Sequence, residues 1–271
     1  MGKIRALILA GNGINCEYET SKACEFAGFD GVDIAYIYDV VRGNYNFDDY
    51  HFLCFPGGFL DGDDLGAAKA AANLFSNAKI ETTNESLRDA LKRFINSGKL
   101  IIGICNGFQL IAKLGIVPAI NDYFVQAATL VFNDSGKFED RWVRLKVEKS
   151  PCIFTRGIKE IYLPVRHGEG KFYAPSQALD EIEKRNLAVL RYAEKATGKP
   201  TQKYPDNPNG SVNAIAGICD PTGRVLGLMP HPEAFLSGLN YPRWTREKLS
   251  KTGQGLSIFK NAYEYLKEKF G

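Results

Sequence analysis

The sequence lacks the features that mark several common classes of protein. No apolar run in the 271 residues approaches the roughly 18 residues of a membrane-spanning helix, so no membrane association is expected. The 34 Lys and Arg residues nearly balance the 31 Asp and Glu residues, and no dense basic stripe occurs, so no nucleic-acid partner is expected. The 45% hydrophobic and 24% charged residues exclude disorder, collagen and coiled coil, and indicate a globular chain.

Targeting, metal and phosphate-binding motifs are also missing. Only five apolar residues follow Lys3-Ile4-Arg5, which is too short for the core of a signal peptide. The six cysteines, scattered from Cys16 to Cys219, contain no close pair, which disfavours a disulfide framework and a zinc site. Cys16 stands where the third glycine of a dinucleotide fingerprint would be, and no phosphate-binding Gly-Lys-Ser/Thr occurs. We therefore expect a cytoplasmic protein with no metal and no cofactor of its own.

The first half alternates apolar runs with helical patterns, which predicts a mostly parallel sheet with helices on both faces. Asn15 is the expected cap of the first helix, and Gly28 its end. The expected strands are 3–10, 32–38, 51–55 and 100–104, and the expected helices are 15–27, 84–96 and 107–114.

The second half predicts antiparallel additions to that sheet. The expected strands are 142–147, 160–164, 188–192, 212–218 and 224–229, followed by an amphipathic helix over 257–270. A polar segment at 238–253 is predicted to form a surface excursion. No internal repeat or low-complexity linker occurs, so residues 1–271 are expected to form a single α/β domain.

The strongest local motif is Gly103-Ile104-Cys105-Asn106-Gly107, where an apolar strand meets a helix. This is the pattern of a nucleophile elbow with Cys in the serine position. The sharp turn strains the backbone of the central residue and leaves no room for flanking side chains, which explains the two glycines. N–H groups at the start of the helix can stabilise a thiolate and a developing oxyanion. The alternative is a buried cysteine beside a helix N-terminus.

A thiolate nucleophile needs a base, and the sequence has three histidines. His51 adjoins a strand, where a surface or strand-edge role is expected. His167 lies in a turn-like segment that can line a pocket. His231 lies between two prolines that hold the loop rigid, with Glu233 two residues on to orient the imidazole. Cys105, His231 and Glu233 thus form a triad by role, although a proline-rich turn with incidental charge is the alternative.

Pro56-Gly57-Gly58-Phe59 follows the third strand, and its glycines allow a backbone N–H to approach a ligand, as an oxyanion hole requires. An ordinary turn is the alternative. The other five cysteines are interpreted as small buried apolar residues. From the residues alone, the interpretation stops at a cysteine-nucleophile hydrolase or acyl transferase on an α/β sheet.

Several motifs occur together in an order that resembles the class I, or triad, glutamine amidotransferases. Within that class, the chain is similar to the glutaminase subunits of phosphoribosylformylglycinamidine synthase over about residues 4–265. The motifs are Asn15-Cys16-Glu17, Pro56-Gly57-Gly58-Phe59, Gly62-Asp63, Gly103-Ile104-Cys105-Asn106-Gly107-Phe108-Gln109, Asn133-x-Ser135-x-x-Phe138, His167-Gly168-Glu169-Gly170, Asn207-Pro208-Asn209-Gly210-Ser211 and Leu226-Gly227-Leu228-Met229-Pro230-His231-Pro232-Glu233. Residues 65–85 look longer than a compact member needs, and 240–255 resemble the tail seen where this domain is fused to its synthetase.

The resemblance implies a flavodoxin-like α/β sandwich and a role for each site residue. Cys105 would be the nucleophile, with His231 and Glu233 completing the triad. The N–H groups of Gly58 and Asn106 would form the oxyanion hole. The residues expected to contact the glutamine substrate are Gln109, Gly57 and His167.

The resemblance also implies partners. Glutamine would be hydrolysed through a cysteinyl thioester, and the ammonia delivered to a large synthetase subunit. That subunit would use ATP and Mg²⁺ to convert formylglycinamide ribonucleotide to its amidine in purine synthesis, and a small accessory subunit is a possible third component. Three alternatives stay open: an amidotransferase of another synthetase, a non-catalytic binding protein on the same fold, and an unrelated cysteine hydrolase such as a peptidase.

Overall fold

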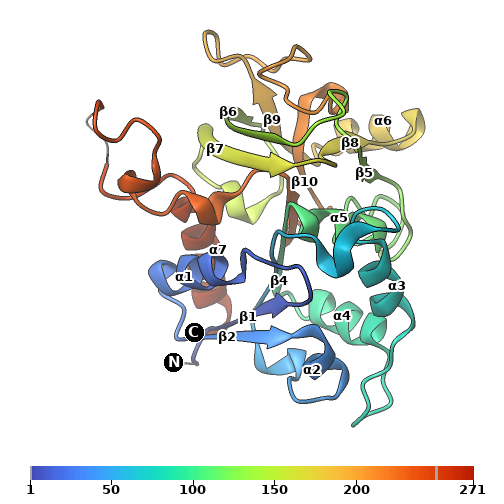
Figure 1. The fold of residues 1–271 in the computed structure, drawn as a ribbon. Coiled ribbons are helices and arrows are strands. Elements are labelled where there is room, and N and C mark those ends of the chain that lie inside the picture. The colour runs from blue at the N-terminus through green and yellow to red at the C-terminus, as the bar shows by residue number, and fades with distance from the viewer. Residues whose placement is uncertain (1, 248–249) are drawn as a thin grey trace.

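In residues 2–247 and 250–271, which this computed structural model describes, nine strands form the central sheet in the order β2-β1-β3-β4-β11-β10-β9-β6-β7 (Figure 1). The strands of this sheet are β1 (Arg5–Ala10), β2 (Gly31–Tyr36), β3 (Phe52–Phe55), β4 (Leu100–Ile104), β6 (Glu139–Val147), β7 (Glu160–His167), β9 (Ala188–Ala193), β10 (Ile215–Cys219) and β11 (Val225–Leu228). A second sheet pairs β5 (Thr129–Val131) with β8 (Lys171–Tyr173).

The sheet has a parallel part and an antiparallel part. Strands β2, β1, β3, β4 and β11 are parallel to one another, and every residue of β3 and β4 is buried. Such continuous apolar strands form because helices cover both faces of a parallel sheet. Strands β10, β9, β6 and β7 extend it in antiparallel order. The predicted fold class, with antiparallel additions from the second half, is confirmed. The strand expected over 224–229 is an exception among these additions, because β11 pairs with β4 in parallel.

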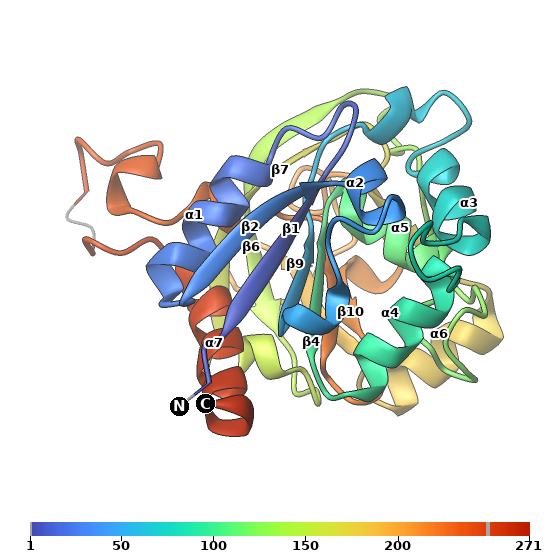
Figure 2. The ribbon, with the colours of Figure 1, turned by 90° about the horizontal axis from the view of Figure 1, so that it is seen from below.

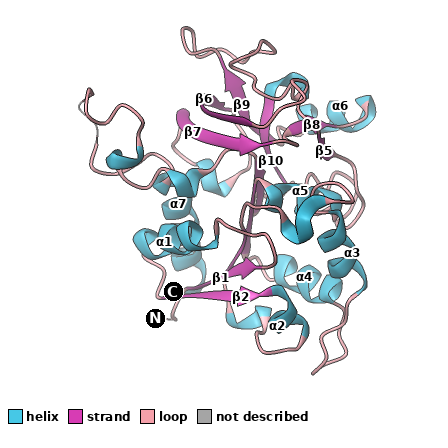
Figure 3. Cartoon of the chain, viewed as in Figure 1, coloured by secondary structure: helices cyan, strands magenta, loops and turns pink. Residues whose placement is uncertain are grey.

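Helices cover both faces of the parallel strands, as Figures 2 and 3 show. Helices α1 and α7 pack together on one face, and α3 packs with α4 and α5 on the other. The helices are α1 (Glu17–Ala27), α2 (Ile37–Val41), α3 (Lys69–Asn77), α4 (Leu87–Asn96), α5 (Asn106–Lys113), α6 (Ser176–Lys184) and α7 (Leu256–Phe270). None of them, in the part of the chain described, is long and apolar enough to cross a membrane.

Local chemistry explains where the elements begin and end. Helix α4 begins after Ser86, whose side chain accepts a hydrogen bond from the Asp89 N–H at 3.0 Å, so the predicted start at residue 84 is too early. Helix α1 begins after Cys16 rather than Asn15, and ends as predicted at Gly28 in the left-handed conformation.

Other differences lie in both halves of the chain. The strand expected over 160–164 continues to His167, because it pairs with β6 along its whole length. The short strands β5 and β8 and the helices α2, α3 and α6 were not predicted from the sequence. Of the predicted excursion at 238–253, residues 248–249 lie outside the described residues; the parts on either side meet in a bridge between Ser237 and Thr252.

The topology gathers the candidate site at one edge of the sheet. Strands β3, β4 and β11 are parallel neighbours, so their carboxyl ends lie side by side. These ends lead into the Gly57-Gly58 turn, Cys105 and the loop that carries His231. Ligand sites of open α/β sheets form at such carboxyl edges.

Candidate functional site

Cys105 occupies the sharp turn between β4 and α5. Its backbone has φ 52° and ψ −106°, a strained conformation for a residue with a side chain. A side chain at Gly103 would place Cβ 2.7 Å from the Gly107 carbonyl oxygen, and one at Gly107 would collide with the Phe55 carbonyl. Both glycines of the motif are therefore required by close backbone packing, which is the geometry of a nucleophile elbow.

The thiol of Cys105 is 5% exposed and lies at the edge of the sheet. Its Sγ is 3.6 Å from the Arg166 carbonyl oxygen, at the end of β7. Its N–H donates to the Leu228 carbonyl oxygen at 2.8 Å, which continues the pairing of β4 with β11. This bond places the nucleophile beside the end of β11, from which His231 follows.

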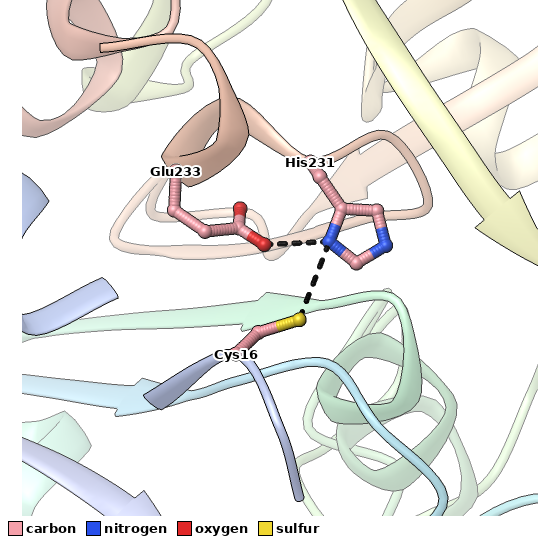
Figure 4. A group of neighbouring side chains, drawn as sticks. All are labelled: Cys16, His231 and Glu233. Atoms are coloured by element: carbon pink, nitrogen blue, oxygen red, sulfur yellow. Dashed lines mark hydrogen bonds and ion pairs between the residues drawn. The ribbon is translucent and has the colours of Figure 1, made fainter. Parts of the chain in front are cut away.

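His231 and Glu233 form a buried pair, each with 2% of its surface exposed. His231 Nδ1 lies 2.5 Å from Glu233 Oε1 (Figure 4). An ionised carboxylate only accepts hydrogen bonds, so Nδ1 carries the proton and the other nitrogen, Nε2, is left to act. Nε2 is buried and has no hydrogen-bond partner among the described residues. The backbone N–H of His231 donates to the Pro164 carbonyl oxygen at 2.8 Å, which fixes the loop against β7.

Electrostatics favours a charged imidazole at His231. Burial alone would lower the pKa of His231, but interactions with Glu233, Cys105 and Cys16 outweigh it and raise this pKa well above its usual value. This shift favours the cationic form of the ring. A cationic imidazole next to a thiol can stabilise a thiolate and then donate a proton to a leaving group.

Gly57 lies at the centre of the site. A Cβ built there would be 2.7 Å from His231 Cε1 and 3.3 Å from both Cys105 Cβ and Cys16 Sγ. The Gly57 backbone therefore lies so close to His231 and Cys105 that a side chain at this position would crowd both of them. Gly57 is placed to form a wall of the site, and its predicted contact with substrate stays a prediction.

The Gly57-Gly58 peptide is held in one orientation. The Gly57 carbonyl oxygen accepts hydrogen bonds from the N–H groups of Asn15 and Cys16, both at 3.3 Å. In a trans peptide the following N–H points the opposite way, so the Gly58 N–H is directed away from α1. Gly58 has φ 147°, and a Cβ would lie 2.5 Å from the Gly13 carbonyl oxygen. The Asn106 N–H belongs to the first turn of α5 and has no intrahelical acceptor. Both N–H groups suit an oxyanion hole, and this role stays a prediction.

The side chains of Asn106 and Gln109 join the elbow to two neighbouring loops. Asn106 Oδ1 accepts from the Leu60 N–H at 3.2 Å, and its Nδ2 donates to Asp63 Oδ1 at 3.1 Å. Gln109 Oε1 accepts from Asn106 Nδ2 at 2.9 Å, while its Nε2 donates to the Glu169 carbonyl. Gln109 is 3% exposed and its amide is used within the protein. Its predicted contact with substrate stays a prediction.

His167 lies next to Arg166 but faces amides rather than acids. Its Nδ1 is 3.1 Å from Asn133 Oδ1 and its Nε2 is 3.4 Å from Asn209 Nδ2. Burial, followed by the nearby charge of His231, lowers the pKa of His167 to about 3, so this ring is neutral. Both ring nitrogens are therefore occupied inside the protein. The predicted role in binding substrate is untested, and these contacts favour a role in holding the loop.

The remaining histidine and the thiols lie as the sequence analysis expected, with one exception. His51 Nδ1 accepts from the Arg5 N–H at 3.3 Å, at the end of the sheet where β3 begins. All six cysteines are free and buried. The exception is Cys16, interpreted as a small apolar residue, whose Sγ lies 3.9 Å from His231 Nδ1 (Figure 4).

Cys16, His231 and Glu233 offer ligand atoms within 4.8 Å of one another, and sulfur, nitrogen and oxygen are all ligands of Zn²⁺. The 2.5 Å contact between Nδ1 and Oε1 is that of a hydrogen bond. Two ligands of one tetrahedral zinc ion would lie about 3 Å apart. In the geometry described, the pair shares a proton.

Sequence reasoning did not assign roles to Cys16, Asn133 or Asn209. Asn133 Oδ1 accepts from the Gly170 N–H at 2.9 Å, and Asn209 Nδ2 donates to the Gly170 carbonyl oxygen at 2.8 Å. Each of the three residues belongs to a motif that carries the resemblance, which was the available signal. Spacing along the chain gave no reason to bring them together.

Similarity to known proteins shows the family to which the chain belongs. The family model described as a CobB/CobQ-like glutamine amidotransferase domain matches residues 3–266. A relative from Methanococcus maripaludis, phosphoribosylformylglycinamidine synthase subunit PurQ, is 42% identical over 273 residues, which cover 96% of this chain and 98% of the relative.

A longer relative and a solved structure extend the comparison. Phosphoribosylformylglycinamidine synthase from Drosophila melanogaster is 34% identical over 245 residues, 88% of this chain but 18% of that protein. The structure of PurLQS from Thermotoga maritima contains a similar chain, with a TM-score of 0.70, 28% identity, and coverage of 98% of this chain and 100% of that one.

Proposed function

Because the chain belongs to the CobB/CobQ-like glutamine amidotransferases, and among them to the PurQ subunits of phosphoribosylformylglycinamidine synthase, we propose that Cys105, His231 and Glu233 hydrolyse glutamine. The chain is the glutaminase subunit that supplies nitrogen for formylglycinamidine ribonucleotide in purine biosynthesis. One observation carries the assignment of residues. Three neighbouring parallel strands end at Gly57-Gly58, at the strained Cys105 and at the His231–Glu233 pair.

In the first step, the Cys105 thiolate attacks the side-chain amide carbon of glutamine. The carbonyl oxygen becomes an oxyanion, which the N–H groups of Gly58 and Asn106 stabilise; losing one such donor typically costs about 3 kcal/mol of barrier. His231, held as a cation by Glu233, donates its Nε2 proton to the leaving nitrogen. Ammonia departs and a thioester remains on Cys105.

In the second step, water hydrolyses the thioester. The neutral His231 takes a proton from the water through Nε2, and the hydroxide adds to the thioester carbon. The second tetrahedral intermediate collapses to glutamate and restores the Cys105 thiolate with its cationic imidazole. The sum is glutamine plus water to glutamate plus ammonia.

A synthetase partner is indicated by the PurLQS structure and by the longer relative, in which a region similar to this chain is one part of the whole synthase. We propose that this partner, and not the present chain, binds ATP and Mg²⁺, and that a small accessory subunit completes the complex. We also propose that residues 1–271 act as one glutamine amidotransferase domain in the cytoplasm.

The decisive experiment reconstitutes synthesis from this chain, the purified synthetase and any accessory subunit, with ATP, Mg²⁺ and formylglycinamide ribonucleotide. Glutamine and ammonium are compared as nitrogen sources, with wild-type chain and with Cys105→Ala. We expect Cys105→Ala to abolish glutamine-dependent synthesis and to leave ammonium-dependent synthesis intact. Loss of both would instead give Cys105 a structural role, and glutamine use without this chain would refute the proposed function.

A further inference from the structure

Cys16 is a second thiol in contact with the proposed catalytic histidine. It is 6% exposed, and its Sγ lies 3.9 Å from His231 Nδ1, on the side of the ring that also faces Glu233 (Figure 4). The mechanism derived above does not use it. From this placement we propose that Cys16 is a positioning residue, which holds the His231 imidazole toward Cys105 and ties it to the Gly57-Gly58 segment.

The contacts of Cys16 with the ring support this role. The Cys16 thiol lies 3.2 Å from Asn15 Oδ1, to which it donates, so its sulfur lone pairs are free to face Nδ1. Burial raises the pKa of the Cys16 thiol, which keeps it neutral. A neutral sulfur beside the Nδ1–H···Oε1 bond excludes water that would compete with Glu233 for the same proton.

The backbone of Cys16 makes the second connection. Its N–H donates to the Gly57 carbonyl oxygen, and its carbonyl oxygen accepts from the Thr20 hydroxyl at 2.7 Å and the Thr20 N–H at 3.1 Å. Cys16 Sγ, His231 Cε1 and Cys105 Cβ all surround the point where a Gly57 Cβ would stand. One residue at the start of α1 therefore contacts both the proposed oxyanion segment and the base.

The pH dependence distinguishes positioning from packing. The titratable groups facing His231 are Glu233 on its own loop, Cys105 at the start of α5, Cys16 at the start of α1 and His167 at the end of β7. Of these groups, His167 is neutral and would repel the cationic His231 ring only if it were protonated. The contact with Cys16 raises the pKa of His231. Removing Cys16 thus lowers this pKa, so the cationic imidazole is lost at lower pH.

The experiment rests on the proposed function and uses the reconstituted synthase with wild-type chain, Cys16→Ala, Cys16→Ser and Cys24→Ala. Cys24 is a matched control, because it is a fully buried thiol of the same helix about two turns from Cys16. For Cys16→Ala we expect a fall of about 10-fold in glutamine-dependent kcat, since small misplacements of reacting groups are costly. We expect the KM for glutamine to stay near wild type, and the alkaline limb of the pH profile to move to lower pH.

Cys16→Ser replaces the thiol with a hydroxyl on a shorter bond. We therefore expect its kcat and the alkaline limb of its pH profile to lie between those of the wild type and Cys16→Ala. Cys24→Ala should keep the wild-type kcat and the wild-type alkaline limb of the pH profile, even if its midpoint of thermal unfolding changes. Ammonium-dependent synthesis should be normal in all variants. The proposal is overturned if Cys16→Ala matches Cys24→Ala in kcat and in the limb, or if it loses ammonium-dependent synthesis equally. If Cys16→Ala does not fold, a wild-type limb in Cys16→Ser overturns it. An inactive wild type would instead count against the proposed function.

Discussion

Two buried histidines stand at the same edge of the sheet, and their surroundings give them different protonation states. His231 pairs with the carboxylate of Glu233, which holds the ring as a cation. His167 lies between the amides of Asn133 and Asn209, which leave it neutral. Each is 2% exposed, so burial does not distinguish them. Of the two rings, only that of His231 has a neighbouring charge that compensates its burial and prepares it to act as an acid.

The largest expected effect comes from removing that compensating charge with Glu233→Gln. The amide keeps the shape of the side chain but does not stabilise the imidazolium, so the pKa of His231 falls. By analogy with changes to the third member of other triads, we expect glutamine-dependent kcat to fall by about 10³- to 10⁴-fold. Steady-state kinetics with glutamine, and with ammonium as the control for folding and assembly, measure this effect. Wild-type turnover with glutamine would remove Glu233 from the mechanism.

A second change keeps every charge and alters only the space between His231 and Cys105. In Gly57→Ala the new methyl group lies 2.7 Å from His231 Cε1, so the ring must move away from the nucleophile. We expect a loss of about 10²-fold in glutamine-dependent kcat, with normal ammonium-dependent synthesis.

Gly31→Ala is the matched control for Gly57→Ala. Gly31 belongs to the edge strand β2, and a Cβ there meets the flexible side chain of Arg5 at 3.3 Å. This variant should keep full activity with both nitrogen sources. Equal kcat values for the two variants would show that the placement of the His231 ring does not limit the reaction.

The two histidines also show which features of the site can be predicted from the sequence. The elbow at Cys105 and the His231–Glu233 pair are local patterns: glycine next to a strained turn, and an acid two residues from a base. The predicted strand 100–104 coincides with β4, because a short apolar run bounded by turn residues favours a buried strand. Such patterns are readable because neighbouring residues in the chain produce them.

Contacts between segments that are distant in the sequence could not be predicted from such local patterns. Asn133 and Asn209 meet His167 only after β5, β8 and the loop before β10 are in place. Cys16 and His231 are 215 residues apart in sequence, and they meet because the end of β11 and the start of α1 lie at the same edge of the sheet. The sheet order that joins them depends on tertiary packing, which residue spacing does not encode.

A third change tests whether His167 binds substrate or holds its loop. In His167→Ala, Asn133 Oδ1 loses its contact with the ring, and Asn209 loses one of its acceptors. Because two buried hydrogen bonds and the packing of the ring are lost, we expect the free energy of unfolding to fall by about 2 kcal/mol. The KM for glutamine should stay near wild type. Urea unfolding and glutamine kinetics separate the two roles: a raised KM at unchanged stability would support a direct contact with substrate.

The smallest effect expected is a dependence of stability on pH that His167 imposes. The folded-state pKa of His167, about 3, lies below its unfolded value near 6.5, so the unfolded chain binds the proton first. Stability therefore falls as the pH drops from about 6.5 toward about 3, and His167 should contribute a loss of about 1 kcal/mol between about pH 7 and about pH 5.5. His231 acts in the opposite sense. Because its folded pKa is raised, its contribution to stability is present below the unfolded pKa and is lost as the pH rises through the folded pKa.

Urea unfolding at both pH values should show a smaller loss of stability on acidification in His167→Ala than in the wild type. An equal loss in both would mean that the His167 ring is already charged in the folded protein, and the contrast between the two histidines would disappear.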